Sequence, residues 1–167
     1  MPRSFQLSFD SPASVEQVHS AFGDEGYWLA RFAAFGGSRT LDSLIVDPDG
    51  TVNVVASSDL LHGALPGILA MLYRGDLNIV STERWTPAGD GRVSGQISVA
   101  VTGAPGSGHG AAVLAPSGSG SRLKLSGTVE FNVPVVGGKI ETYIAAQFAK
   151  GLSDVQHFTT TWISEHA

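Results

Sequence analysis

The fold class follows from residues 122–165, which read RLKLSGTVEFNV, then PVVGG, then KIETYIAAQFAKGLSDVQHFTTTWISE. From 122 to 133 apolar and polar residues alternate, as in a strand with one buried face and one face in solvent. From 139 to 165 apolar residues recur at helical spacing and predict a long amphipathic helix. Its apolar stripe consists of Ile140, Ile144, Phe148, Leu152, Val155, Phe158 and Trp162, whereas Lys150, Ser153, His157 and Thr161 lie opposite. We therefore expect this helix to cover one face of an antiparallel sheet.

Six further segments predict strands upstream of this stretch. They lie at 3–10, 38–47, 51–58, 76–86, 92–102 and, more briefly, 111–115. Residues 92–102 alternate most clearly and predict an inward side made of Val93, Ile97, Val99 and Val101. With the strand at 122–133, the sequence predicts a curved antiparallel sheet of about seven strands.

Two short helices are expected between the first two strands. An apolar stripe at 15–22 follows Ser11 and Pro12, which we expect to cap the helix and to fill its first position. A second helix is predicted over Glu25–Phe35, where Gly36-Gly37 ends it. A third short helix is expected within the apolar segment 60–74.

Glycines are concentrated in residues 103–110, GAPGSGHG, which have the glycine spacing of a phosphate-binding loop. His109 stands where that motif needs a lysine, Gly110 stands where it needs a hydroxyl, and no helix follows. We therefore interpret 103–110 as a flexible hairpin loop, and 116–121 as a second loop.

The order of the elements, with strands grouped beside separate helices, predicts an α+β architecture. The pattern contains no repeat and no interdomain linker, and 167 residues fit one domain, so we treat residues 1–167 as a single unit. A curved sheet around one long helix need not contact that helix everywhere. A gap between the two would be an apolar cavity.

Composition excludes several classes of protein. Charged residues are only 15% of the chain, the net charge is −5, and there is no run of four basic residues, so nucleic acid is not an expected partner. The chain has no cysteine, which excludes disulfides and thiolate nucleophiles. Its longest apolar run, 64–73, is shorter than the ~20 residues of a membrane-spanning helix. The start of the chain does not resemble a signal peptide, and we expect a cytoplasmic protein.

The order of elements resembles the helix-grip fold of the START-like, or SRPBCC, superfamily, which includes birch-pollen-allergen-like proteins and polyketide cyclases. Ser11–Val18 resembles the opening strand-to-helix segment of the superfamily, and Val133–Glu141 resembles its entry into the last helix. Together with Glu83–Thr86 and Trp162, these segments look closest to an actinobacterial branch. That branch is a domain family of unknown function. The resemblance covers essentially the whole chain.

This resemblance implies that a hydrophobic or aromatic small molecule, or a lipid, binds in a central cavity between the sheet and the last helix. We expect the cavity to be lined by large apolar side chains and one carboxylate. The predicted ligand-binding residues are Trp28, Phe32, Phe35, Leu65, Leu69, Glu83, Trp85, Phe131 and Phe148. The same apolar side chains are equally compatible with a filled core.

Glu83 is the one candidate for chemistry. By alternation it shares the more apolar face of its strand with Leu77, Ile79 and Trp85, where a carboxylate could anchor a ligand hydroxyl or act as a general acid or base. A bulge that reverses the register, or a position at the rim, is the alternative. The five histidines lie on separate elements without metal-ligand spacing, so neither a metal nor a cofactor is expected.

Two alternatives to ligand carriage stay open. One is a polyketide cyclase/aromatase-like enzyme in which Glu83 handles protons, although few other titratable residues face inward. The other is an interaction module with a filled core, whose apolar segment 60–74 binds a partner or a second copy to form a homodimer.

Overall fold

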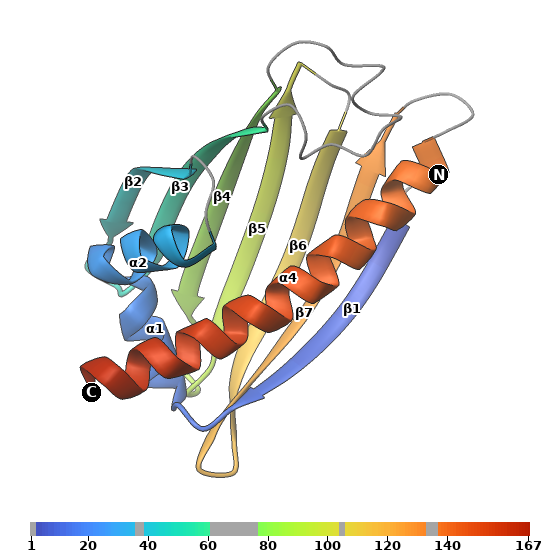
Figure 1. Cartoon of the computed structure of the whole chain (residues 1–167). Coiled ribbons are helices and arrows are strands. Elements are labelled where there is room, and N and C mark those ends of the chain that lie inside the picture. The colour runs from blue at the N-terminus through green and yellow to red at the C-terminus, as the bar shows by residue number, and fades with distance from the viewer. Residues whose placement is uncertain (1–2, 36–38, 61–76, 104–105, 133–136) are drawn as a thin grey trace.

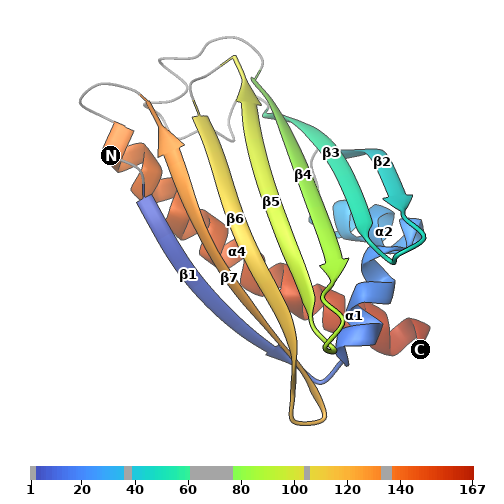
Figure 2. The same ribbon diagram turned by 180° about the vertical axis from the view of Figure 1, so that it is seen from behind.

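A seven-stranded antiparallel sheet and a long C-terminal helix across its concave face form the two layers of the protein (Figures 1 and 2). The computed structural model describes residues 3–35, 39–60, 77–103, 106–132 and 137–167. The strands follow the order β1-β7-β6-β5-β4-β3-β2 across the sheet. Their bounds are β1 Arg3–Ser11, β2 Arg39–Val46, β3 Val52–Leu60, β4 Leu77–Pro87, β5 Val93–Thr102, β6 Gly106–Ser117 and β7 Gly120–Phe131. The predicted α+β helix-grip architecture is confirmed.

Three helices lie in the described part of the chain, all on the concave side of the sheet. Helix α4 spans Gly137–His166 and crosses the sheet diagonally (Figure 1). Helices α1, Val15–Phe22, and α2, Glu25–Phe35, cover the sheet beside the C-terminal half of α4. The bounds of α2 agree with the prediction. The helix expected within 60–74 falls mostly on residues outside the described ones.

The alternation predicted for the two clearest strands is confirmed. In β5 the residues Val93, Gly95 and Ile97 face inward, while the polar residues between them are exposed. In β7 the inward positions are the buried residues Leu123, Leu125, Val129 and Phe131. Because side chains alternate with period two, each strand has one dry and one wet face.

Residues 106–110 are strand, and the prediction of a flexible loop over 103–110 was wrong. Strand β6 begins at Gly106 and continues to Ser117 without the predicted break. It pairs with β5 on one side and β7 on the other, so its backbone groups are satisfied by two ladders despite the weak strand preference of glycine. The second predicted loop shrinks to a two-residue turn at Gly118-Ser119, where Gly118 has φ 58°.

The start of α1 also differs from the prediction. Ser14, not Ser11, caps the helix: its Oγ accepts from the Gln17 N–H at 3.1 Å, and the Gln17 side chain accepts from the Ser14 N–H at 2.9 Å. This reciprocal pair satisfies two amides at once, which a cap at Ser11 would not do. The Ser11 hydroxyl instead contacts Thr160 Oγ1 on α4 at 2.8 Å.

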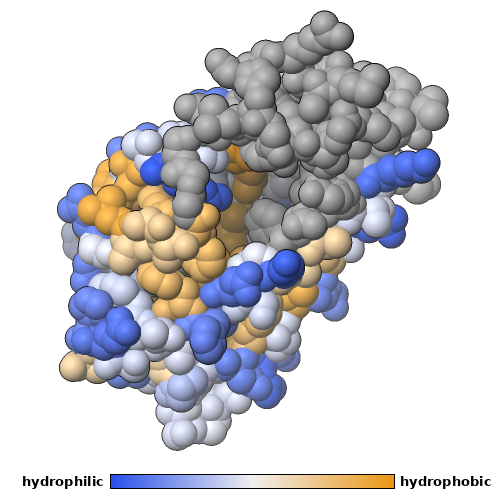
Figure 3. Space-filling view, in the orientation of Figure 1, coloured by the Kyte–Doolittle hydropathy of each residue, from blue (hydrophilic) through white to orange (hydrophobic). Residues whose placement is uncertain are grey.

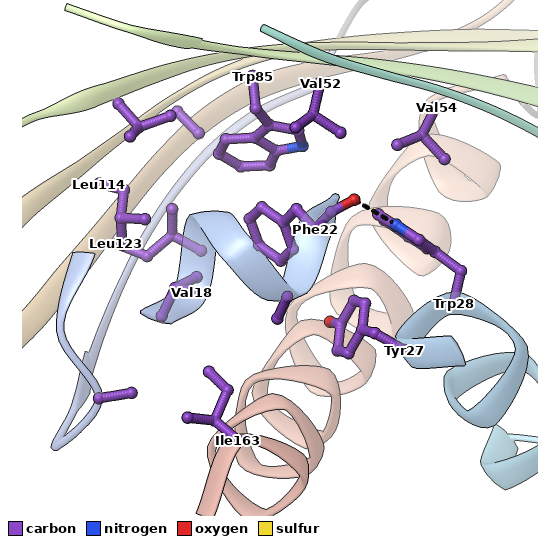
Figure 4. Close-up of a cluster of buried hydrophobic side chains, with 14 of the residues drawn as sticks. Val18, Phe22, Tyr27, Trp28, Val52, Val54, Trp85, Leu114, Leu123 and Ile163 are labelled. Atoms are coloured by element: carbon purple, nitrogen blue, oxygen red, sulfur yellow. Dashed lines mark hydrogen bonds between the residues drawn. The ribbon is translucent and has the colours of Figure 1, made fainter. Parts of the chain in front are cut away.

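The core is densest where α1 and α2 meet the sheet (Figure 4). Trp28 and Tyr27 of α2 are fully buried, and the Trp28 indole N–H donates to the Phe22 carbonyl at 2.7 Å. The Phe22 ring in turn lies 4.8 Å from the ring of Trp85 on β4. These aromatic contacts join the two short helices to the sheet at this end of the molecule.

The side chains of α4 that are described and buried are more polar than predicted. Leu152, Val155, Phe158 and Trp162 of the predicted stripe are half-buried, and the side chains of Ile140, Ile144 and Phe148 lie outside the described part. Among the described side chains of α4, the buried positions are instead Glu141, Gln156, Thr159 and Ile163. A count of apolar residues alone therefore missed the polar part of this face.

Candidate ligand cavity

A cavity lies between α2, α4 and the inner face of the sheet. Its walls are mostly apolar and come from every layer of the fold. Figure 3 shows the outer part of this hollow as a recess with orange walls between α2 and α4. The lining residues are Phe9, Phe22, Tyr27, Arg31, Glu83, Trp85, Ile97, Ala112, Leu123, Leu125, Leu152, Val155, Gln156 and Thr159.

The volume of the hollow differs according to whether the part that is open to solvent is included. It contains about 430 Å³ of atom-free space, part of it open to solvent, and about 40 Å³ of this accommodates the centres of water-sized molecules. One water needs about 10–15 Å³ by this measure, so the smaller volume holds a few waters, and a larger molecule would also occupy the part of the hollow that is open to solvent.

The sheet side of the cavity is formed by Trp85 and its neighbours. Trp85 is 3% exposed, and its indole N–H is buried with no hydrogen-bond partner among the described residues. Glu83 stands two residues away on the same face and is half-buried. In the ladder Glu83 pairs with Ile97 and Trp85 with Gly95, so no bulge reverses the register between them. Glu83 therefore faces inward, as predicted.

Polar groups on the helical side satisfy one another. The Thr159 hydroxyl donates to the Val155 carbonyl at 2.8 Å, which leaves its oxygen to accept the Tyr27 hydroxyl proton at 2.6 Å. The pair joins α2 to α4 across the cavity wall. Because both hydroxyls are engaged, these two groups need no ligand to offset the cost of their burial.

Arg31 is the charged group of the helical wall. Its guanidinium carbon lies 4.8 Å from the ring centroid of Trp28, one turn earlier on α2. Its Nε–H is buried and has no acceptor among the described residues. Arg39 on β2 lies in the same way 5.7 Å from the ring centroid of Phe32. Both cations are therefore held against aromatic faces.

The charges of this region influence one another. Desolvation by the surrounding protein lowers the pKa of Arg39, and the positive charge of Arg31 lowers it further, whereas the carboxylate of Glu83 raises it. The guanidinium stays protonated, because the ordinary pKa of an arginine side chain lies far above neutral pH. Arg31, Arg39 and Glu83 thus form one electrostatic group beside the cavity.

The structure places the predicted ligand-binding residues in different surroundings. Glu83 and Trp85 line the cavity, whereas Trp28 and Phe32 are packed in the core behind it. Phe35 is 48% exposed near the end of α2, where its ring lies 5.8 Å from that of Phe158. Phe131 is buried at the end of β7. Leu65, Leu69 and the side chain of Phe148 lie outside the described part of the chain.

Four polar lining residues were missed by sequence analysis: Tyr27, Arg31, Gln156 and Thr159. Arg31 has a signal in the sequence, since it is the only basic residue in the otherwise largely apolar segment EGYWLARFAAF. Gln156 and Thr159 on α4 have no such signal in the sequence, because polar residues at helical spacing are the ordinary pattern of a solvent face.

Neither a metal site nor a membrane helix is found in the described chain. Among these residues, no three histidine, aspartate or glutamate side chains gather as metal ligands would. The helices described here are also too short or too polar to cross a bilayer.

A curved seven-stranded sheet that holds one long C-terminal helix is the helix-grip fold, which birch-pollen-allergen-like, or SRPBCC-type, proteins also have. Solved structures agree. Ara h 8.0201 superposes with a TM-score of 0.58 at 13% identity over 99% of both chains. Norcoclaurine synthase from Thalictrum flavum, in complex with dopamine and hydroxybenzaldehyde, gives 0.55 at 13% identity over 100% of this chain and 89% of that one.

The chain belongs to the family described as "Protein of unknown function (DUF2505)", whose model matches residues 6–163. One relative is the uncharacterized protein Rv0481c of Mycobacterium tuberculosis, which is 38% identical over 173 residues that cover 99% of each chain. The predicted resemblance to an SRPBCC branch of unknown function is confirmed.

Proposed function

We propose that this protein is a single ligand-binding domain, residues 1–167, that carries an apolar small molecule between α4 and the concave face of the sheet. The observation that carries the proposal is the cavity lining. Apolar and aromatic side chains make up most of it, and a few polar groups stand among them, as in sites for small molecules. Burial of the apolar body of the ligand would supply most of the affinity.

Two further observations support this proposal. The inner face of β6 carries glycines at 108 and 110, which add no side chain of their own to the interior, although a Cβ at Gly110 would already contact Leu125 Cδ1 at 3.5 Å. Norcoclaurine synthase, which shares the fold, holds two small aromatic molecules. An aromatic ligand would suit the rings of Phe22 and Trp85 in the same way.

The test uses the neutral apolar dye N-phenyl-1-naphthylamine, whose emission rises in apolar surroundings. We expect the protein to bind it, and Leu152→Trp to weaken binding at least about tenfold, because the larger ring on α4 enters the cavity. The matched control is Leu29→Trp, at a position of α2 that is 52% exposed. Equal binding by both variants, or no emission change with the unaltered protein, would refute the proposal.

Native mass spectrometry of freshly purified protein gives an independent test. A retained apolar molecule that is released on denaturation would identify the ligand class directly. It should be absent from Leu152→Trp and present in Leu29→Trp.

A cyclase/aromatase-like enzyme is the second candidate, and the position of Glu83 in the cavity lining favours it. A carboxylate there could move a proton on a bound substrate. Turnover of a polyketide-like substrate that is lost in Glu83→Gln would support this function over carriage alone. A homodimer and a cytoplasmic location stay predictions from the sequence.

A further inference from the structure

Two cations and one carboxylate gather at one side of the cavity. Arg31 and Glu83 both belong to its lining. The rings of Trp28 and Phe32, which hold the Arg31 and Arg39 guanidiniums, have centroids only 6.0 Å apart. The positive charge of Arg31 acts on Arg39, whose pKa it lowers, and together with Glu83 the two cations leave one positive charge without a counterpart.

Inside the described part of the protein, the charge of Glu83 offsets only one of the two positive charges. Arg31 and Arg39 form no ion pair there, whereas Arg92 and Arg122 have carboxylate partners at the surface. The Nε–H of Arg31 is also buried without an acceptor. A buried donor without an acceptor is uncommon in folded proteins, and a bound ligand is one of the ways in which such a group is satisfied.

The position of Arg31 explains what kind of group would satisfy it. A guanidinium presents its N–H groups as a planar fork that fits the two oxygens of a carboxylate. The same lining includes the apolar side chains of Phe22 and Trp85. A molecule with one anionic end and one apolar body would match both parts of the wall.

We propose that the ligand is an apolar monocarboxylate, whose carboxylate binds Arg31 within the field of Arg39 and whose apolar body lies against Phe22 and Trp85. This inference rests on the proposed function and adds the chemical class of the ligand. A ligand with a single negative charge balances the net positive charge of Arg31, Arg39 and Glu83, whereas the two negative charges of a phosphate dianion would exceed it. Glu83 limits the attraction, since its carboxylate repels the ligand's own.

The test compares two ligands that differ only at the polar end: 2-naphthoate and 2-naphthalenemethanol. Each is titrated against protein loaded with N-phenyl-1-naphthylamine. We expect 2-naphthoate to displace the dye at about tenfold lower concentration than the alcohol, because hydrogen bonds to charged groups are the stronger ones. Arg31→Gln should remove this preference and Arg39→Gln should reduce it, while Glu83→Gln should increase it. The alcohol should bind all variants alike.

The opposite effects of the arginine and glutamate variants keep the inference testable if one variant does not fold. Far-ultraviolet circular dichroism checks each variant, and Arg39→Gln with Glu83→Gln suffices if Arg31→Gln unfolds. Equal displacement by the two ligands, or a preference that survives loss of the arginines, overturns the carboxylate assignment and leaves the proposed function in place. Tighter binding of 2-naphthyl phosphate than of 2-naphthoate also overturns it. Absence of dye binding by the unaltered protein refutes the proposed function itself.

Discussion

The indole ring of Trp85 lies across Gly95 on the neighbouring strand, so closely that a Cβ on Gly95 would come within 2.5 Å of ring carbon Cζ3. The same arrangement recurs twice on the concave face, where Phe131 covers Gly106 and Phe5 covers Gly127. In each pair the ring uses the space that a side chain would otherwise take. These glycines let large rings lie flat on the sheet instead of standing up toward α4.

Gly95→Ala should destabilise the protein by about 1–3 kcal/mol, because the added methyl group forces the buried Trp85 ring to move. Urea denaturation followed by circular dichroism measures the change. Gly151→Ala on α4 is the matched control, since a Cβ there meets nothing within 4 Å. The control should stabilise the helix by about 0.5–1 kcal/mol. If Gly95→Ala is as stable as the original protein, the Trp85 ring can adopt another position at little cost in free energy.

The Tyr27–Thr159 hydrogen bond should cost different amounts when broken from its two ends. Tyr27→Phe removes the donor and leaves Thr159 bonded to Val155, so we expect a loss of about 1 kcal/mol in unfolding free energy. Thr159→Val leaves a buried tyrosine hydroxyl without its acceptor and should cost more, up to about 3 kcal/mol. In a double-mutant cycle the combined variant should lose less than both single losses added together. Strict additivity would mean that the hydroxyls do not interact.

Glu141 should be a structural carboxylate at the start of α4. It is 1% exposed and accepts the Phe131 N–H at 2.9 Å, which joins the end of β7 to the helix. Glu141→Ala leaves that buried amide without this acceptor and should lower the unfolding free energy by about 1–3 kcal/mol. Glu141→Gln keeps an oxygen in place and should cost less. The exposed Glu165 on the same helix is the control, where alanine should change stability by less than about 0.5 kcal/mol.

The Asp10–Arg122 pair should give a weak, salt-sensitive dependence of stability on pH. Arg122 Nε donates to Asp10 Oδ1 at 2.7 Å, and this bond holds the pKa of Asp10 below its ordinary value of 3.8. Because the folded pKa is the lower one, the stabilisation is fully present above pH 3.8 and is lost as the pH falls through the folded value. Both side chains are exposed, so the effect is small and is screened by salt.

Carboxyl-detected NMR titration measures the Asp10 pKa directly. It should rise toward the ordinary value in Arg122→Gln and in high salt. Lys124→Gln, two residues along the same face of β7, should leave it nearly unchanged. If Asp10 has the same pKa with and without Arg122, the pair does not contribute to the pH dependence of stability.

Most of the sheet could be predicted from alternation, because burial of one face imposes a period of two on the sequence. Leu123, Leu125 and Phe131 illustrate this, as do Val93 and Ile97. Strand β6 could not be predicted in this way. Gly106, Gly108 and Gly110 carry no apolar pattern, and only the two neighbouring ladders make them strand.

The cavity was predictable only in part. Alternation placed Glu83 and Trp85 on the inner face, since both lie on one regular strand. Arg31 and Tyr27 belong to a short helix whose orientation over the sheet is set by tertiary packing, which a single segment does not encode. In the sequence, Thr159 has the pattern of an exposed helix residue. Only its tertiary contact with Tyr27 shows that it is buried.

The pairing of β1 with β7 joins the first strand of the chain to the last. Every residue of β1 finds its partner more than 100 positions later, from Ser11 with Ser121 to Arg3 with Val129. At typical rates of synthesis, Phe5, Leu7 and Phe9 therefore emerge from the ribosome roughly 5–25 s before the strand that pairs with them. Contacts so distant in sequence slow folding, because the chain must close a large loop before they form. The nascent protein thus exposes the apolar face of β1 without its partner strand while the more than 100 intervening residues are synthesised, and the β1–β7 pairing forms only when β7 arrives.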